Sequence, residues 1–270
     1  MTAYQPIQTM QRAHGAAQVT LGPTAGLQRL RTEGSAKAIL PGGEGVPEVV
    51  FLNTSGGLTS GDALRYGLDL QGGRAVATTQ TAERAYKAIG TPARMDVDLS
   101  VGKDGWLDWL PQETILFDRA ALHRRTVINL APGAGCLALE AVVLGRAAMG
   151  ETVRHLRFRD RREIRRNGTP VWIDPLALEY LPLQDSALGA GAAGIGGARA
   201  FASIVMTDEV ALAPLRAVLD EPGVEASASV FSGRTLVRML ARDGWPLRRQ
   251  IARALDILRQ GRPLPRVWQL

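Results

Sequence analysis

Residues 189–194 read G-x-G-x-x-G, the spacing with which dinucleotide-binding proteins hold a pyrophosphate at a helix N-terminus. Asp208 follows at roughly the distance of the acid that binds the ribose in such folds. That chemistry needs a buried strand before the glycines and a helix after them. Here proline and polar residues precede them, and residues 200–206 have the composition of a strand. We therefore expect a glycine-rich loop over residues 189–197, and a nicotinamide-dependent oxidoreductase stays an alternative.

Nucleophiles and metal-binding side chains are scarce in this chain. The one cysteine is Cys136, and the histidines are His14, His123 and His155. The sequence contains no G-x-S-x-G, P-loop or H-E-x-x-H motif. Any catalytic or metal site would therefore depend on carboxylates. The single cysteine also excludes a disulfide framework and fits a reducing compartment.

Residues 154–166 contain seven arginines and one histidine, interrupted by Asp160 and Glu163. Such a stripe is one way to bind nucleic acid, but those sites usually interleave aromatic side chains, and only Phe158 is available. We favour a solvated hairpin face or a protein-docking face, with Arg162 and Arg165 as candidate partner-binding residues. A basic, β-rich nucleic-acid-binding protein stays the alternative.

Short β segments separated by Gly, Pro, Asn and Asp dominate residues 15–183. Residues 96–101 alternate polar and apolar side chains, as a strand with one solvated face does. Residues 164–172 predict a hairpin, because Asn167-Gly168 suits a type I′ turn. The other predicted strands are residues 18–21, 35–40, 48–53, 64–70, 75–81, 106–110, 124–130 and 137–144.

Two helices are predicted in the C-terminal third. Residues 208–219 have helical spacing, although Pro214 permits only a short or kinked helix. Residues 246–260 form the better candidate, with an apolar stripe that would pack on the sheets and Gly261 as a stop. The stripe consists of Leu247, Ile251, Leu255 and Leu258. We predict a mainly β chain with two C-terminal helices in one domain over residues 1–270.

Composition describes a globular, basic chain: 270 residues, 46% apolar, with a net charge of +6 and a pI of about 10.1. This charge admits nucleic acid, anionic lipid or an acidic protein as partner. The N-terminus lacks the basic start and apolar stretch of a secretory signal, and no run reaches the ~20 apolar residues of a membrane span. We expect a cytoplasmic protein without a membrane partner.

Four segments stand out by composition: they are rich in glycine and threonine, or they gather large apolar residues around a proline. Residues 56–62 read G-G-L-T-S-G-D, residues 78–86 T-T-Q-T-A-E-R-A-Y, residues 107–117 L-D-W-L-P-Q-E-T-I-L-F, and residues 144–151 L-G-R-A-A-M-G-E. Each alone is compatible with a tight connection in a β protein. Together, in this order and at these separations, they resemble the urease accessory protein family UreD, also called UreH. The resemblance covers residues 15–180.

This resemblance implies a scaffold without catalytic activity. Such a scaffold binds apo-urease and a second accessory protein, UreF, which recruits the nickel-carrying GTPase UreG. It also implies a stacked, helical arrangement of many strands. No cofactor would be held permanently, and nickel would pass in transit. With so few thiols and imidazoles, the passage would offer carboxylates, backbone carbonyls and water, which are weak ligands for nickel and suit release.

Matching positions supply the candidate site residues. The candidates for nickel passage are Asp62, Glu113, Glu151 and Asp174. Two of these carboxylates have alternatives, since Asp62 would also cap its turn and Glu151 would also neutralise Arg146. Arg84 and Tyr86 are expected to organise the structure or an interface rather than to touch metal.

Overall fold

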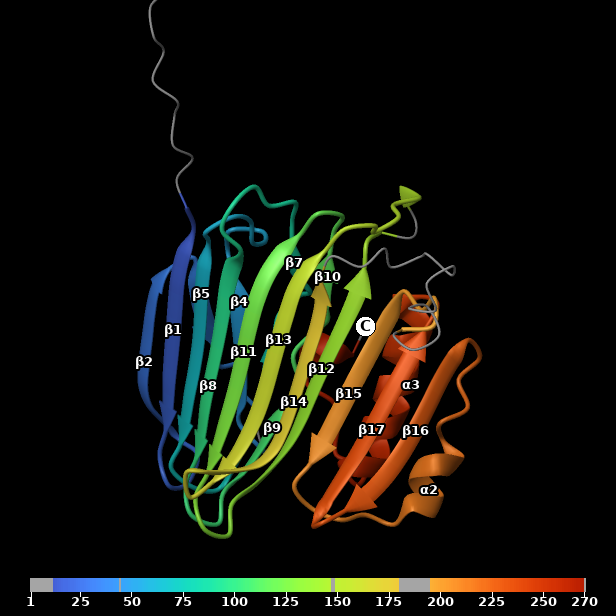
Figure 1. The fold of residues 1–270 in the computed structure, drawn as a ribbon. Coiled ribbons are helices and arrows are strands. Elements are labelled where there is room, and N and C mark those ends of the chain that lie inside the picture. The colour runs from blue at the N-terminus through green and yellow to red at the C-terminus, as the bar shows by residue number, and fades with distance from the viewer. Residues whose placement is uncertain (1–11, 44, 147–148, 180–194, 270) are drawn as a thin grey trace, which may run out of the picture.

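The computed structural model describes residues 12–43, 45–146, 149–179 and 195–269. Within these residues the strands form two stacked sheets, a narrow sheet of seven strands and a wide sheet of ten (Figure 1). The helices cover the outer face of the C-terminal part of the wide sheet. No helix in the described part of the chain has the length and apolar character needed to cross a membrane.

The narrow sheet is mostly parallel. Its strands are β1 (His14–Leu21), β2 (Leu27–Gly34), β5 (Ala63–Leu70), β8 (Ala93–Val101), β11 (Ala121–Leu130), β13 (Arg157–Arg166) and β14 (Thr169–Glu179). They lie in the order β14-β13-β11-β8-β5-β1-β2. The neighbours from β1 to β13 pair in parallel, and antiparallel hairpins close both edges.

The wide sheet joins a parallel half to an antiparallel half. Its strands are β3 (Ala36–Ile39), β4 (Glu48–Asn53), β6 (Arg74–Thr79), β9 (Trp106–Trp109), β12 (Gly135–Leu144), β15 (Ala200–Met206), β16 (Val224–Phe231) and β17 (Arg234–Ala241). The short β10 (Thr114–Leu116) pairs with β12, and the short β7 (Glu83–Ala85) pairs with β10. The main order is β16-β17-β15-β12-β9-β6-β4-β3. Strands β4, β6, β9 and β12 are parallel neighbours.

The chain winds between the two sheets as a flattened helix. Parallel neighbours need a long crossover, and here each crossover is a strand of the opposite sheet: β4 is followed by β5, β6 by β8, β9 by β11, and β12 by β13. This confirms the mainly β fold with strands in a stacked, helical arrangement.

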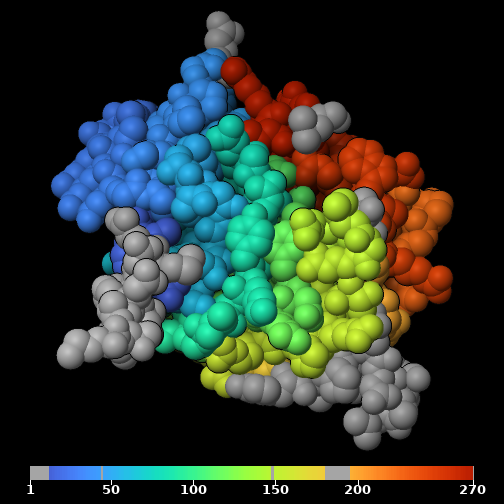
Figure 2. Space-filling model, turned by 90° about the horizontal axis from the view of Figure 1, so that it is seen from above, coloured from blue at the N-terminus to red at the C-terminus, as the bar shows by residue number. Residues whose placement is uncertain are grey.

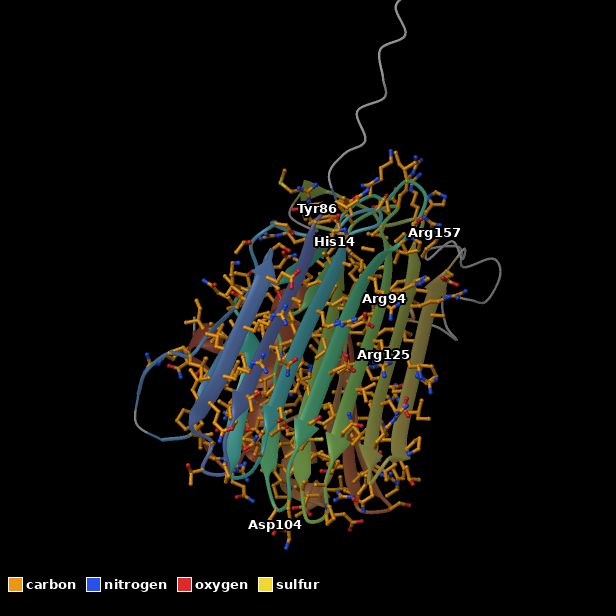
Figure 3. All side chains as sticks on the ribbon, turned by 90° about the vertical axis from the view of Figure 1, so that its left-hand side faces the viewer. His14, Tyr86, Arg94, Asp104, Arg125 and Arg157 are labelled. Carbon is orange, nitrogen blue, oxygen red and sulfur yellow. The ribbon has the colours of Figure 1, made fainter. Side chains whose placement is uncertain are left out.

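The two ends of this helix differ. At the upper end in Figure 1 the chain passes from the wide to the narrow sheet through loops whose described residues are 54–62, 86–92, 117–120, 145–146 and 149–156, here called the upper loops. Figure 2 looks onto these loops. At the lower end the tight turns are residues 71–73, 102–105, 131–134 and 167–168. Figure 3 shows Tyr86 and Arg157 at the upper end and Asp104 at the lower.

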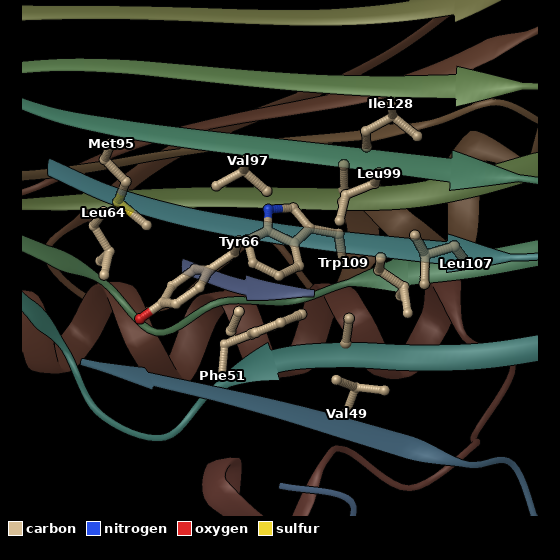
Figure 4. Packing of buried hydrophobic residues seen from close by; sticks show 14 of the residues in the cluster. Val49, Phe51, Leu64, Tyr66, Met95, Val97, Leu99, Leu107, Trp109 and Ile128 are labelled. Carbon is tan, nitrogen blue, oxygen red and sulfur yellow. The ribbon is translucent and has the colours of Figure 1, made fainter. Parts of the chain in front are cut away.

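Two buried clusters hold the layers together. The larger lies between the sheets, where Phe51, Tyr66 and Trp109 are almost fully buried (Figure 4). The ring centroids of Phe51 and Tyr66 are 4.8 Å apart in a stacked arrangement, a geometry that adds to the gain from burial. The second cluster lies between the wide sheet and the helices.

The helices are close to the predicted ones. The better predicted helix is observed as α3 (Gly244–Leu258), and all four residues of its apolar stripe are buried. The side chain of Asp243 caps it by accepting from the Trp245 amide. The predicted helix over residues 208–219 shortens to α2 (Leu212–Ala217), with Pro214 in the first turn, where its missing N–H costs nothing. A short 3₁₀ turn, η3 (Arg266–Trp268), follows α3.

The hairpin around Asn167-Gly168 is confirmed as β13–β14, with φ values of 50° and 79° at the two turn residues. Strand β4 has the predicted bounds, and β15 confirms the strand predicted after the glycines. Strands β2, β16 and β17 were not predicted. β2 is exposed on both faces, so its residues carry no alternation of apolar and polar side chains.

Candidate functional site

Five charged side chains gather in the layer between the two sheets. Arg124 comes from β11, Glu140 from β12, Asp160 and Arg162 from β13, and Asp174 from β14; together they are called the charge cluster. Each has at most 9% of its side chain exposed. Buried charges at this depth are tolerated only when they are paired.

The pairs form a continuous chain. Arg124 donates to both carboxylate oxygens of Asp160, at 3.0 and 2.8 Å, and its Nη1 lies 2.8 Å from Glu140 Oε2. Arg162 Nη2 donates to Asp174 Oδ2 at 2.7 Å, and its Nε lies 3.5 Å from Asp160. Charges therefore alternate along the series Glu140, Arg124, Asp160, Arg162 and Asp174.

Strand register explains this alternation. Phe158, Asp160, Arg162 and Ile164 occupy alternate positions of β13, so they share the face that turns to the core. Arg124 lies directly opposite Asp160 on the neighbouring strand, and Arg162 directly opposite Asp174 on the other side. Directly opposed residues of opposite charge are favourable cross-strand pairs.

Electrostatics in the charge cluster follow from burial. Burial by itself lowers the pKa of Arg124, but the charges of Asp160 and Glu140 outweigh burial and leave that pKa raised. Burial raises the pKa of Glu140, and the attraction of Arg124 offsets this only in part. Glu140 therefore keeps a raised pKa although it shares the Arg124 guanidinium with Asp160.

A cavity of about 450 Å³ opens beside the charge cluster, between the edge strand β14 and strands β15, β16 and β17 of the wide sheet. Its polar lining includes Ser203, Ser227, Glu225 and Arg238 in addition to the five clustered charges. Arg238 donates to Asp174 Oδ1 at 3.1 Å, and 61% of its side chain is exposed. Asp174 therefore connects the buried pairs to an exposed arginine.

The carboxylate and hydroxyl groups that line this cavity offer oxygen ligands to a cation. The described residues contain no group of three or more His, Cys, Asp or Glu side chains placed to hold a metal ion. Burial raises the pKa of the Cys136 thiol to about 12, so it is not available as a thiolate. A divalent cation here would meet carboxylates already paired with arginine, which favours weak and transient contact over storage.

The structure places the other three candidate carboxylates elsewhere. Asp62 accepts from the amides of Ala13 and Thr59, both at 2.8 Å, so it holds the turn at the start of β5. Glu151 accepts from the Asp118 amide at 3.2 Å and from Arg146 Nε at 3.2 Å. Asp62 thus has the contacts of a turn cap, and Glu151 has the contact with Arg146 that would neutralise this arginine.

Glu113 lies on the outer side of the wide sheet, next to α3. Its carboxylate is 3.6 Å from Arg248 Nη1, and the same guanidinium donates to Gln112 and lies over the ring of Trp268. Among the described residues, no hydrogen bond or ion pair joins Asp62, Glu113, Glu151 and Asp174 to one another. They do not form one site.

Of the candidate partner-binding residues, Arg162 was expected to be exposed, and this expectation is wrong. Arg162 has 9% of its side chain exposed, because it shares the inward face with Phe158. Arg165 faces outward, with 37% exposed, and donates to Glu163 at 2.8 Å. The hydrogen bond from Arg165 lowers the pKa of Glu163.

The arginines of β13 are not a bare basic stripe. Besides Arg162 and Arg165, their guanidinium groups contact acceptors within the chain: Arg157 donates to Gly90 O, Arg159 to Glu179, Arg161 to Glu163, and Arg166 to Ala134 O. Their charge is thus partly satisfied internally, which weakens the case for a nucleic-acid stripe.

Arg84 and Tyr86 belong to β7 and the loop that follows it. The Tyr86 ring stacks on Phe117, with centroids 4.9 Å apart and planes 3° from parallel. Arg146 lies over the other member of the stack, 4.9 Å from the Phe117 centroid. Three separate upper loops therefore meet through their side chains.

Backbone hydrogen bonds join the same loops. The amide of Leu58 donates to Arg84 O at 2.7 Å, and the amide of Tyr86 donates back to Leu58 O at 2.8 Å. The Ala88 amide donates to Arg119 O at 3.0 Å, and the Arg119 amide to His155 O at 2.8 Å. The upper loops form one connected surface.

Sequence reasoning missed Arg124, Glu140 and Asp160. Each of them carried a signal. Glu140 interrupts the apolar run of β12, Asp160 has the same parity as Phe158 and Ile164, and Arg124 has the same parity as Leu122, Ile128 and Leu130 in β11. These parities were not used, because an arginine or aspartate in an alternating strand is ordinarily assigned to the solvent face.

Comparison with known proteins covers nearly the whole chain. The sequence model of the family described as UreD urease accessory protein matches residues 13–269. A Cereibacter sphaeroides protein named Urease accessory protein UreD is 61% identical over 98% of both chains. Proteins of the same name from Paracoccus denitrificans and Rhizobium leguminosarum bv. viciae are 54% and 42% identical, over 99% and 96% of this chain and 96% and 94% of their own.

Proposed function

The chain belongs to the UreD family of urease accessory proteins, and we propose that it is the scaffold that bridges apo-urease to UreF and the nickel-carrying GTPase UreG. The observation that carries this proposal is the match of essentially the full chain to relatives named urease accessory protein UreD. A role in urease maturation follows from that membership. The bridging role is the finer step that experiment must test.

The scaffold would act without chemistry of its own. We infer that it turns over no substrate and holds no permanent cofactor, and that its place is the cytoplasm with its partners. The mainly β architecture supports a scaffold role, since two stacked sheets fix the upper loops on a rigid base. Purified protein should therefore hydrolyse no urea.

We propose that nickel passes through the cavity beside the charge cluster. Asp174 is the one candidate carboxylate that lines it, and 61% of the side chain of its partner Arg238 is exposed to solvent. An entering cation would replace the charge of Arg238 on Asp174. Asp62, Glu113 and Glu151 each contact a backbone amide or an arginine. These contacts support a structural role for the three carboxylates as the alternative to a role in nickel passage.

The test is urease nickel content in a strain that lacks this protein, grown at limiting nickel. We expect urease to be synthesised and free of nickel. Complementation with Asp174→Asn should restore less nickel than the unchanged protein, and the deficit should shrink as nickel is raised. Asp98→Asn is the matched control, because Asp98 is half-exposed and pairs with Arg125 on the outer face. Full nickel occupancy in the deletion strain would refute the proposed function.

A further inference from the structure

The two most exposed large apolar side chains of the described residues lie in the upper loops. Ile89 is 81% exposed and Met149 is 73% exposed. Tyr86, in the same loop as Ile89, is 42% exposed. Figure 2 shows the segments that carry them, teal and yellow-green, on one face of the molecule. Exposed apolar side chains gathered in this way mark an interaction site more often than scattered ones do.

Exposed cations lie on the same part of the molecule. The exposed basic residues on the upper loops and on β7 are Arg84, Lys87, Arg119, Arg146 and Arg154. The carboxylates at this end are engaged: Asp118 accepts from the amides of Arg154 and His155, and Glu151 accepts from the Asp118 amide and from Arg146. The surface therefore presents an apolar centre with a positive rim.

The surface is also pre-organised. The stack of Tyr86 on Phe117 and the hydrogen bonds among the upper loops already hold it in place. Arg157 Nη2 adds a bond to Gly90 O at 2.6 Å, directly after Ile89. A surface that needs little ordering on association loses less entropy when a partner binds.

We propose that the upper loops are a docking surface for an acidic protein face with an apolar recess that receives Ile89 and Met149. This inference rests on the proposed scaffold function, and it specifies the chemistry of one partner. Exposed arginine, tyrosine and methionine around an apolar centre are the composition of a protein interface. Nucleic-acid interfaces are more polar, and one face of the Tyr86 ring is covered by Phe117 and so is closed to a base.

The experiment measures binding of the full-length protein to purified apo-urease and, separately, to purified UreF. Lys87→Glu reverses a charge on the positive rim, and Lys103→Glu makes the same change in an exposed turn at the opposite end. Ile89→Ser removes the apolar centre, and Val46→Ser truncates another exposed apolar residue, 41% exposed, outside the upper loops. Circular dichroism confirms that each variant is folded.

We expect Lys87→Glu and Ile89→Ser each to raise the dissociation constant for one of the two partners about tenfold or more, while Lys103→Glu and Val46→Ser leave it unchanged. The effect of Lys87→Glu should shrink at high salt, as for a rim charge. Unchanged affinity of both upper-loop variants for both partners would overturn the inference. It would also be overturned if the protein bound duplex DNA at physiological salt and the two upper-loop substitutions weakened that binding but not the binding of either protein. Neither result would refute the proposed scaffold function, because that function is tested separately by the nickel content of urease in the deletion strain.

Discussion

At the scale of single residues, the position of a charge on its strand decides what it does. Arg162 and Arg165 lie three positions apart on β13 and therefore face opposite sides of the narrow sheet. Arg162 belongs to the charge cluster, whereas Arg165 is at the surface beside Glu163. The same residue type thus has a structural role at one position and a solvent-facing role at the other.

We expect Arg162→Ala to lower the free energy of unfolding by about 3–5 kcal/mol, because it leaves the buried carboxylates of Asp160 and Asp174 without this partner. Arg165→Ala should leave the unfolding free energy nearly unchanged, since exposed ion pairs contribute little. Urea unfolding monitored by circular dichroism measures both. Equal effects of the two substitutions would contradict the assignment of Arg162 to the interior.

Glu83 predicts a pH dependence of stability. Burial raises its pKa from 4.5 to about 7, and the hydrogen bonds from Asn53 offset burial only in part. The folded state therefore binds more protons than the unfolded state between these two values. The contribution of Glu83 to stability is fully present below a pH of about 4.5 and is lost as the pH rises through about 7.

Glu83→Gln should remove this dependence. The unfolding free energy of the variant, relative to that of the unchanged protein, should rise between a pH of about 5 and one of about 8. Urea unfolding at the two pH values measures the difference. A constant difference would mean that Glu83 titrates as an ordinary glutamate.

At the scale of elements, α3 is held by its apolar stripe. Leu255 is fully buried in the second cluster, between the helix and the wide sheet. Leu255→Asp should lower the unfolding free energy by about 3–5 kcal/mol, through an unpaired buried charge or undocking of the helix. Ala252→Asp places the same residue on a partly exposed position of α3 and should cost less than about 1 kcal/mol. Equal melting temperatures for the two variants would show that the stripe is not packed.

The first upper loop depends on one glycine. A Cβ at Gly57 would lie 2.5 Å from the Tyr86 ring and 2.7 Å from Arg84 O, at a φ of +147°. Gly57→Ala should therefore displace Tyr86 from Phe117 and destabilise the protein by more than the ~1 kcal/mol of backbone strain. Gly56→Ala is the control, because its φ is +79° but a Cβ there meets open space. Thermal unfolding ranks the two, and a greater loss for Gly56→Ala would contradict the packing.

At the scale of the whole molecule, the wide sheet contributes to both buried clusters. Leu107 in β9 and Leu110 directly after it are three residues apart, yet Leu107 belongs to the cluster between the sheets and Leu110 to the cluster under the helices. The two buried clusters are therefore joined by a sheet that belongs to both, and not by a flexible linker. This arrangement favours a single cooperative unit.

Unfolding should accordingly show one transition. Leu255→Ala, a change in the second cluster, should lower the urea midpoint seen by far-ultraviolet circular dichroism and by tryptophan fluorescence to the same extent. Trp109 reports on the first cluster and Trp268 on the second. Two separate transitions would show that the two clusters unfold independently.

Local patterns predicted many of the elements. Strand β4, the Asn167-Gly168 hairpin and α3 follow from alternation, turn chemistry and helical periodicity, each of which acts within a few residues. The hairpin of β16 and β17 was not predicted. Its local signal was the Ser232-Gly233 pair at the turn, where both residues have positive φ in the structure.

The candidate site was predicted less completely. Asp174 and Arg162 were both selected, but as unrelated residues on a metal path and on an exposed face. Their contact exists because β13 and β14 pair in one register, which a shift of a single residue would abolish. Glu140 joins the same cluster from the wide sheet, and no local sequence pattern predicts a contact between residues of two different sheets.

By itself, the sequence determined the family, the mainly β class, the helix α3 and the turns, because each of these depends on residue types at short, regular spacing. Only the tertiary structure decided which charges are buried, which of the candidate carboxylates line a cavity, and that the four motif segments contribute to one connected surface at the upper end. The physical reason is that sheet register and the stacking of two sheets bring together residues far apart in the chain, and a side chain's burial and partners are properties of that assembly.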